Sequence, residues 1–209
     1  MAMRAIAAAA ALVAFASPAG AQTRPYLAGT AGYTFPETVG SNIGVEAETK
    51  RGYAVTGAAG YSFGNVRAEL EAGYRKSDVD EARGLGLRVE GTGEVSALSA
   101  LANAYYEPRL QLGPLQPYIG GGAGIARFKA RRVGAVGVPG LGPVSASETG
   151  FAYQLMAGAG WRVSEQATLT AGYRYFATPD IDTTVAAVGP VKIDGLGLHA
   201  VEIGLRFGL

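Results

Sequence analysis

The sequence predicts an all-β fold: an eight-stranded antiparallel up-and-down transmembrane β-barrel that follows a cleaved signal peptide. Three observations predict this class. Apolar and polar residues alternate with a period of two in segment after segment. Long and short connections alternate between those segments, and charged residues gather on one face of the strands. Beyond the N-terminal segment no run approaches 18 apolar residues, which excludes transmembrane helices.

The N-terminal segment has the features of an export signal. Arg4 supplies the positive charge, Ala5–Ala16 form the apolar run, and Ala19-Gly20-Ala21 present a small-x-small cleavage pattern. We therefore expect a signal peptide over residues 1–21 and an outer-membrane β-barrel domain over residues 22–209. A retained N-terminal anchor is the alternative, but a spanning helix needs about 20 apolar residues and this run is shorter.

The eight expected strands alternate in facing, most clearly in the third, where Leu70 and Tyr74 face away from Glu69 and Glu71. The fifth is ambiguous in facing because it contains three consecutive glycines. The expected strands are 26–35, 53–63, 66–76, 98–106, 117–128, 151–163, 167–175 and 199–209.

The connections between these strands alternate strictly between short and long. The short ones are 64–65, 107–116 and 164–166, and the long ones are 36–51, 77–95, 129–150 and 177–196. In an up-and-down barrel this order places all long loops at one end, and all turns with both termini at the other. Outer-membrane barrels have this arrangement, with the long loops outside the cell.

The charged face of the strands is expected to point into the barrel. An arginine facing lipid near the bilayer midplane would cost about 2–4 kcal/mol, whereas charges of both signs can pair inside. The expected interior charge network comprises Arg67, Glu69, Glu71, Arg75, Arg162, Arg174, Glu202 and Arg206.

Aromatic residues on the other face fall near the strand ends, as two belts at the membrane interfaces. A general preference of aromatics for strands is the alternative, but it does not predict two bands. The expected aromatic girdle comprises Tyr33, Tyr53, Tyr61, Phe63, Tyr74, Trp161, Tyr175 and Phe207.

Several segments resemble the opacity-type and OmpA/OmpX-like family of small Gram-negative outer-membrane barrels: 102–106 (ANAYY), 117–124 (PYIGGGAG), 172–176 (GYRYF) and 205–209 (LRFGL). The resemblance covers essentially the whole chain after the signal. It implies residence in the outer membrane, insertion by the barrel-assembly machinery, and roles in adhesion, surface integrity or immune interaction. The family's closing strand usually ends in an aromatic residue, whereas here Leu209 is last and Phe207 lies two before it.

Arg127, Lys129, Arg131 and Arg132 form the densest basic run, and the topology places it at the outer rim. We expect these residues to contact phosphates of lipopolysaccharide, because clustered cations attract anionic headgroups. A merely solvated rim is the alternative.

No cofactor, metal or catalytic site is expected. The chain has no cysteine, and its net charge of +1 gives no support for nucleic-acid binding. Gly120–Gly124 lacks the helix and Lys-Ser/Thr pair of a phosphate loop. His199, the single histidine, lies on the lipid face with no partner on its own strand.

The sequence therefore predicts a surface-exposed structural barrel, not an enzyme, whose long loops contact lipopolysaccharide, host or envelope partners. Two alternatives stay open. One is a narrow channel for ions or very small solutes, and the other is a membrane-embedded hydrolase built on His199. An eight-stranded barrel is just wide enough for side chains to fill, which disfavours a wide pore.

Overall fold

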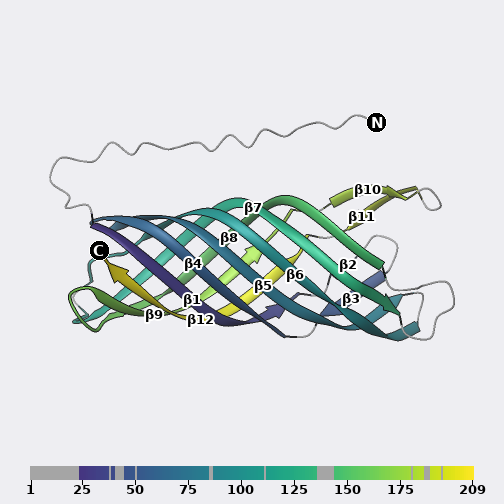
Figure 1. Ribbon diagram of the computed structural model, residues 1–209, viewed down its shortest axis with the longest axis horizontal. Coiled ribbons are helices and arrows are strands. Elements are labelled where there is room, and N and C mark those ends of the chain that lie inside the picture. The colour runs from purple at the N-terminus through teal and green to yellow at the C-terminus, as the bar shows by residue number, and fades with distance from the viewer. Residues whose placement is uncertain are drawn as a thin grey trace.

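The structure is a computed structural model in which residues 24–37, 39–40, 45–49, 51–84, 87–110, 112–135, 144–179, 181–185, 189–193 and 195–209 are described. The expected signal peptide lies outside the described residues. The described part of the chain contains no helix with the length and hydropathy of a membrane span. Its strands wind around one another into a single tilted cylinder (Figure 1), and the predicted eight-stranded barrel is confirmed.

Eight strands form the wall: β1 (Arg24–Pro36), β4 (Gly52–Phe63), β5 (Val66–Gly84), β6 (Leu87–Tyr106), β7 (Leu115–Ala135), β8 (Val144–Arg162), β9 (Ala167–Ala177) and β12 (Gly197–Gly208). Each pairs antiparallel with the next, and β12 pairs with β1 from Tyr26↔Gly208 to Pro36↔Leu198. This last pairing closes the barrel and leaves no free edge along the seam.

Four short strands lie beyond the wall at the long-loop end. They are β2 (Val39–Gly40), β3 (Val45–Thr49), β10 (Ile181–Val185) and β11 (Gly189–Ile193). β3 pairs with β2 and with the distal part of β5, whereas β10 and β11 form a separate hairpin.

The predicted strand lengths were wrong at this end. Residues 77–95 and 129–150 were expected as loops, yet β5 runs to Gly84, β6 starts at Leu87, β7 runs to Ala135 and β8 starts at Val144. Alternation of apolar residues marks only the part of a strand that meets lipid. Beyond it, backbone hydrogen bonding between the strands continues in water, and the sequence carries no periodic signal for it.

The alternation itself gave the correct faces. On β5, Leu70 is 71% exposed, while Glu69 and Glu71 are buried. The structure also resolves the facing of β7, where Ile119 and Ile125 point outward and Gly120 and Gly122 point inward.

The inward glycines of β7 make room for side chains of β6. A Cβ atom on Gly120 would collide with the Tyr105 ring, and one on Gly122 would collide with the Asn103 amide. The outward Gly121 has only ordinary contacts in the place of a Cβ atom. The glycine run is therefore a packing feature of the barrel interior.

Candidate functional site: the lumen and the outer rim

The barrel interior is lined by ionic side chains from three strands, β5, β9 and β12, and from the segment after β6. Of the predicted network, the structure buries Arg67, Glu69, Glu71, Arg75, Arg174 and Glu202, and half-buries Arg206. The prediction that Arg162 belongs to the interior network was wrong, because its side chain is exposed. Its position has inward parity, but β8 ends at this residue, so the side chain lies beyond the wall in a depression at the turn end.

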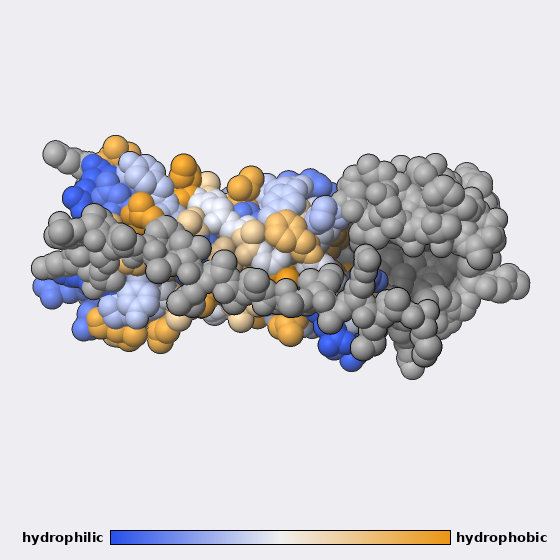
Figure 2. Space-filling view, turned by 90° about the horizontal axis from the view of Figure 1, so that it is seen from above, coloured by the Kyte–Doolittle hydropathy of each residue, from blue (hydrophilic) through white to orange (hydrophobic). Residues whose placement is uncertain are grey.

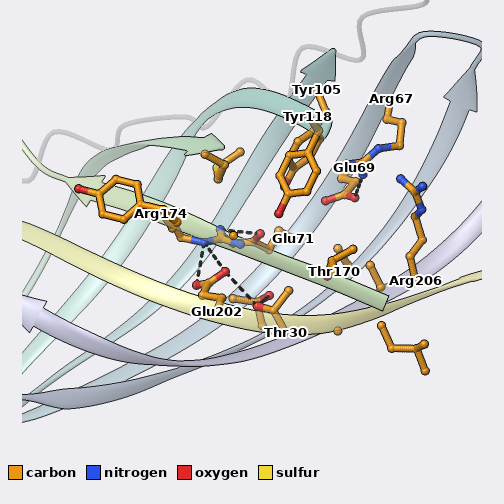
Figure 3. A pocket seen from close by; sticks show the side chains of 18 residues that line it. Thr30, Arg67, Glu69, Glu71, Tyr105, Tyr118, Thr170, Arg174, Glu202 and Arg206 are labelled. Carbon is orange, nitrogen blue, oxygen red and sulfur yellow. Dashed lines mark hydrogen bonds and ion pairs between the residues drawn. The ribbon is translucent and has the colours of Figure 1, made fainter. Parts of the chain in front are cut away.

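One ionic cluster is centred on Arg174. Its Nη1 atom lies 2.8 Å from a Glu71 oxygen, and its Nε lies 2.9 Å from Glu202 (Figure 3). The Gln154 amide accepts from Arg174 at 2.7 Å and donates to the Asn103 carbonyl oxygen at 2.8 Å. Hydrogen-bonded neutral groups thus join the ion pairs into a network across the lumen, in which the buried charges are compensated.

A second cluster lies toward the turn end. Arg67 pairs with Glu69 at 2.6 Å and with Glu107 at 2.7 Å, and Arg206 reaches the same Glu107 oxygen at 2.6 Å. The Arg67 guanidinium also stacks on the Tyr105 ring, 4.0 Å from its centroid. Glu107 was missed by sequence reasoning because it directly follows the fourth predicted strand and was assigned to a connection.

The interior charges of the described residues balance. Four arginines (Arg67, Arg75, Arg174 and Arg206) face four glutamates (Glu69, Glu71, Glu107 and Glu202). Since an unpaired buried charge costs several kcal/mol, this balance explains how an apolar-walled cylinder tolerates an ionic centre.

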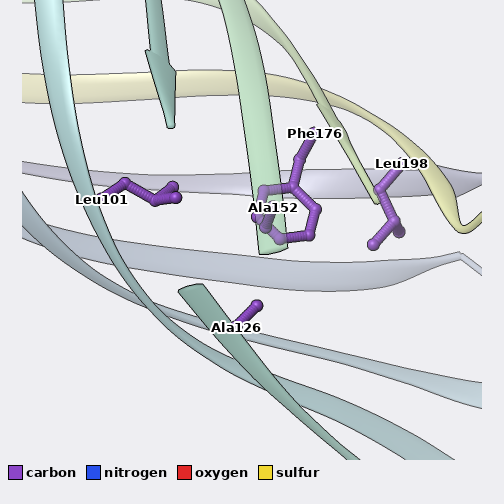
Figure 4. Close-up of a cluster of buried hydrophobic side chains, with 5 residues drawn as sticks. All are labelled: Leu101, Ala126, Ala152, Phe176 and Leu198. Carbon is purple, nitrogen blue, oxygen red and sulfur yellow. The ribbon is translucent and has the colours of Figure 1, made fainter. Parts of the chain in front are cut away.

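Little open space remains among the described side chains of the lumen. Between the two clusters a cavity of about 40 Å³ remains, space for about three water molecules. Toward the long-loop end lies a cluster of five buried apolar side chains, which we call the apolar plug (Figure 4): Leu101, Ala126, Ala152, Phe176 and Leu198. The Arg75 guanidinium lies 4.0 Å from the Phe176 ring centroid and so joins the plug to the ionic network.

The outer surface carries the apolar face. Among the predicted girdle residues, Tyr33, Tyr53, Tyr61, Tyr74, Trp161 and Phe207 are exposed, and Phe63 and Tyr175 are half-buried. Between the belts, residues such as Ile203, 71% exposed, have no protein cover. Hydrophobic patches occupy the described wall, and strongly hydrophilic residues lie toward its ends (Figure 2). Such exposure suits a bilayer and not water.

Three of the four predicted phosphate-contacting cations lie on the outward face of β7, directly above the exposed Ile125. Arg127, Lys129 and Arg131 are all exposed, and we call them the β7 basic ridge. Arg127 donates to Ser147 Oγ at 3.1 Å, and Arg131 lies 3.7 Å from Glu94. Arg132 belongs to β7, but its side chain lies outside the described residues.

His199 has partners that its own strand did not reveal. Its Nε2 atom lies 2.7 Å from Glu37 Oε1, its Nδ1 atom is hydrogen-bonded to the Tyr173 hydroxyl, and its ring packs on Tyr175. These partners come from β9 and from the residue after β1, so only the strand register could have shown them. The backbone groups of β9 and β12 pair with each other here.

The described residues contain no group of three or more His, Cys, Asp or Glu side chains placed to hold a metal ion.

The fold agrees with the comparison to known proteins. The model of the outer membrane protein beta-barrel domain matches residues 5–191. The chain belongs to this family. It is a small outer-membrane β-barrel of a Gram-negative bacterium.

The relatives add little on activity. An uncharacterized protein of Brucella abortus (strain 2308) is 28% identical over 166 residues, covering 68% of this chain and 56% of that protein. One of Brucella suis biovar 1 (strain 1330) is 31% identical over 141 residues, covering 56% and 49%. The chain thus spans about half the length of the curated relatives it matches.

Among solved structures, Neisserial surface protein A is similar with a TM-score of 0.58 and 19% identity, covering 88% of this chain and 96% of that chain. At this identity the similarity shows the fold of the outer-membrane barrel and nothing about its ligands.

Proposed function

We propose that this outer-membrane barrel is a non-catalytic surface protein that binds lipopolysaccharide at its outer rim and presents its distal hairpins to host or envelope partners. One observation carries the proposal: the lumen is filled by a charge-balanced network and an apolar plug, while cations stand exposed on the outer wall.

The filled lumen argues against the narrow-channel alternative. An ion path would require separation of Arg174 from Glu71 and displacement of Phe176. Planar-bilayer recordings of the refolded chain are expected to show no steady open state. A stable conductance would contradict the proposed structural role and support a channel.

The β7 basic ridge supports the lipopolysaccharide contact. Its three side chains continue the outward face of β7 beyond the exposed Ile125, where we expect the level of the lipid headgroups. Cations at this level attract anionic lipid, and arginine binds phosphate with its planar fork.

The distal hairpins support the contact with other proteins. The β5–β6 and β7–β8 pairs continue past the apolar face as paired ladders, each with one register shift, so paired backbone extends beyond the lipid-facing part of the wall. Binding specificity usually depends on residues in segments that a rigid scaffold positions in this way. Insertion by the barrel-assembly machinery, through the closing strand β12, belongs to the same proposal.

The test replaces the basic run by R127Q/K129Q/R131Q/R132Q in the intact chain. We expect cells carrying this variant to be more sensitive to polymyxin and detergent than wild-type cells. The matched control is R109Q/R162Q, which removes exposed cations at the turn end and is expected to change nothing. Equal sensitivity of the run variant and wild type, at equal barrel levels, would remove the ridge from the proposal.

A further inference from the structure

A groove of about 1130 Å³ runs along the outward face of β1, β4 and β12 toward the outer rim. Ala31 of β1 forms its floor, since the register places this small residue between Val55 of β4 and Ile203 of β12. Tyr33, next along the same face, stands between Tyr53 and Val201. A small residue flanked by larger ones leaves a channel in the wall with apolar sides.

The groove lies in the lipid-facing part of the wall. Its lining residues Val201, Ile203 and Tyr33 are exposed to 60%, 71% and 73%, and residues at this level face acyl chains and not water. An apolar channel open to hydrocarbon is filled by hydrocarbon, so its natural occupant is one acyl chain lying along the strand.

The mouth of the groove at the rim holds a fixed cation. The Arg51 guanidinium lies over the Phe35 ring, 5.3 Å from its centroid, and no described carboxylate lies within ion-pair distance of it. The other charges at the mouth are Lys76, which pairs with Glu94 at 2.5 Å, and Asp78. Among the described residues at the mouth, Arg51 is therefore the cation available to an anionic headgroup.

We propose that this groove binds one molecule of lipopolysaccharide, with an acyl chain of its lipid A along Ala31 and a phosphate on Arg51. The apolar channel and the cation at its end match the two parts of this amphiphile, and lipopolysaccharide supplies the outer leaflet. The site is distinct from the β7 basic ridge, because three wall strands separate β1 from β7 on either side. It rests on the outer-membrane location and not on the ridge.

The experiment measures lipid A retained by the full-length barrel after extraction in mild detergent and extensive washing, by native mass spectrometry. Wild type is expected to retain about one lipid A per barrel. A31W fills the groove floor and is expected to lower retention at least about tenfold, while R51Q is expected to lower it about tenfold, the value of one charge-assisted hydrogen bond to phosphate. A102W adds the same bulk to an exposed outward site on β6 and is expected to leave retention unchanged.

Folding of each variant is checked by heat-modifiable migration, and A31L replaces A31W if the larger side chain prevents insertion. Unchanged retention in the folded Ala31 variant overturns the proposal, as does wild-type barrel carrying phospholipid and lipid A in the bulk membrane ratio, or carrying a second copy of the chain instead of lipid. The ridge variant R127Q/K129Q/R131Q/R132Q should keep its groove lipid. A negative result at the ridge and a negative result at the groove are thus separate outcomes.

Discussion

Arg174 Nη1 donates to both carboxylate oxygens of Glu71 across the barrel interior, at 2.9 and 2.8 Å. The two residues are 103 positions apart in the chain. They meet because β5 and β9 lie on opposite sides of the lumen of the closed barrel. Their contact is central to the network that fills the lumen.

Removing one partner of this pair should be far more damaging than removing both. R174M leaves Glu71 buried without its main counter-charge and is expected to destabilise the barrel by about 3–5 kcal/mol. E71L/R174M is expected to cost markedly less than the sum of the single variants, because the interior again holds equal numbers of arginines and glutamates, although the pair of Arg174 with Glu202 stays broken. Urea unfolding in lipid vesicles measures both. Additive single and double losses would show that the pair is not coupled.

Two adjacent glycines of β7 should differ sharply in tolerance. G120V places a side chain against the Tyr105 ring and is expected to prevent formation of the heat-modifiable barrel. G121V points outward, where a Cβ atom makes only ordinary contacts, and is expected to fold normally. Gel migration of unboiled samples checks this. Folding of both variants alike would mean that Tyr105 is free to move from its stack on Arg67.

His199 is expected to contribute to the outer rim mechanically and not chemically. H199A removes the contacts to Glu37 and Tyr173 and should lower stability by about 1 kcal/mol, the worth of a partly exposed hydrogen bond. The acyl content of lipid A, measured by mass spectrometry in cells expressing either form, should be identical. Loss of an acyl-chain modification in H199A would revive the hydrolase alternative.

Lys76 and Glu94 lie beyond the outer aromatic belt and should make the β5–β6 hairpin sensitive to pH. Their hydrogen bond and mutual charge lower the pKa of Glu94 and raise the pKa of Lys76. The pair therefore stabilises the hairpin above the usual glutamate pKa and loses this effect as pH falls through the lowered value. At the alkaline end the effect is full below the usual lysine pKa and is lost as pH rises through the raised value.

Limited proteolysis at low salt is the measurement. E94Q is expected to speed cleavage of the β5–β6 hairpin at neutral pH and to leave the rate unchanged at pH values where Glu94 is protonated. The difference should shrink as salt is added, because exposed ion pairs are screened. A difference that persists at high salt would indicate a packing effect of the glutamate.

The alternation of residues such as Glu69 and Leu70 was sufficient to predict the barrel, its facing and most of its interior charges. It could not predict where β5 and β6 end, because the ladder around Gly84 continues in water without an apolar face. It also missed Glu107, which continues the inward parity of Tyr105 but directly follows the predicted end of the strand.

Side-chain contacts between strands could not be predicted from the sequence either. The link from Tyr173 through His199 to Glu37 depends on the relative shift of β9, β12 and β1, and the groove over Ala31 depends on the same shift. Alternation within one strand carries no information about its register with the next, so these sites appear only once all eight strands are paired.

The seam between β1 and β12 also has a consequence for how the molecule forms. Tyr26 and Gly208 are register partners, so the cylinder closes only when two segments from opposite extremes of the described chain meet. Pairings of such separation are entropically costly and form slowly. Before that event the outer strands expose unpaired amides that lipid cannot satisfy. Closure is therefore the step that assistance from another protein would accelerate most. Small defects in β12 should lower the rate of assembly before they lower the stability of the finished barrel.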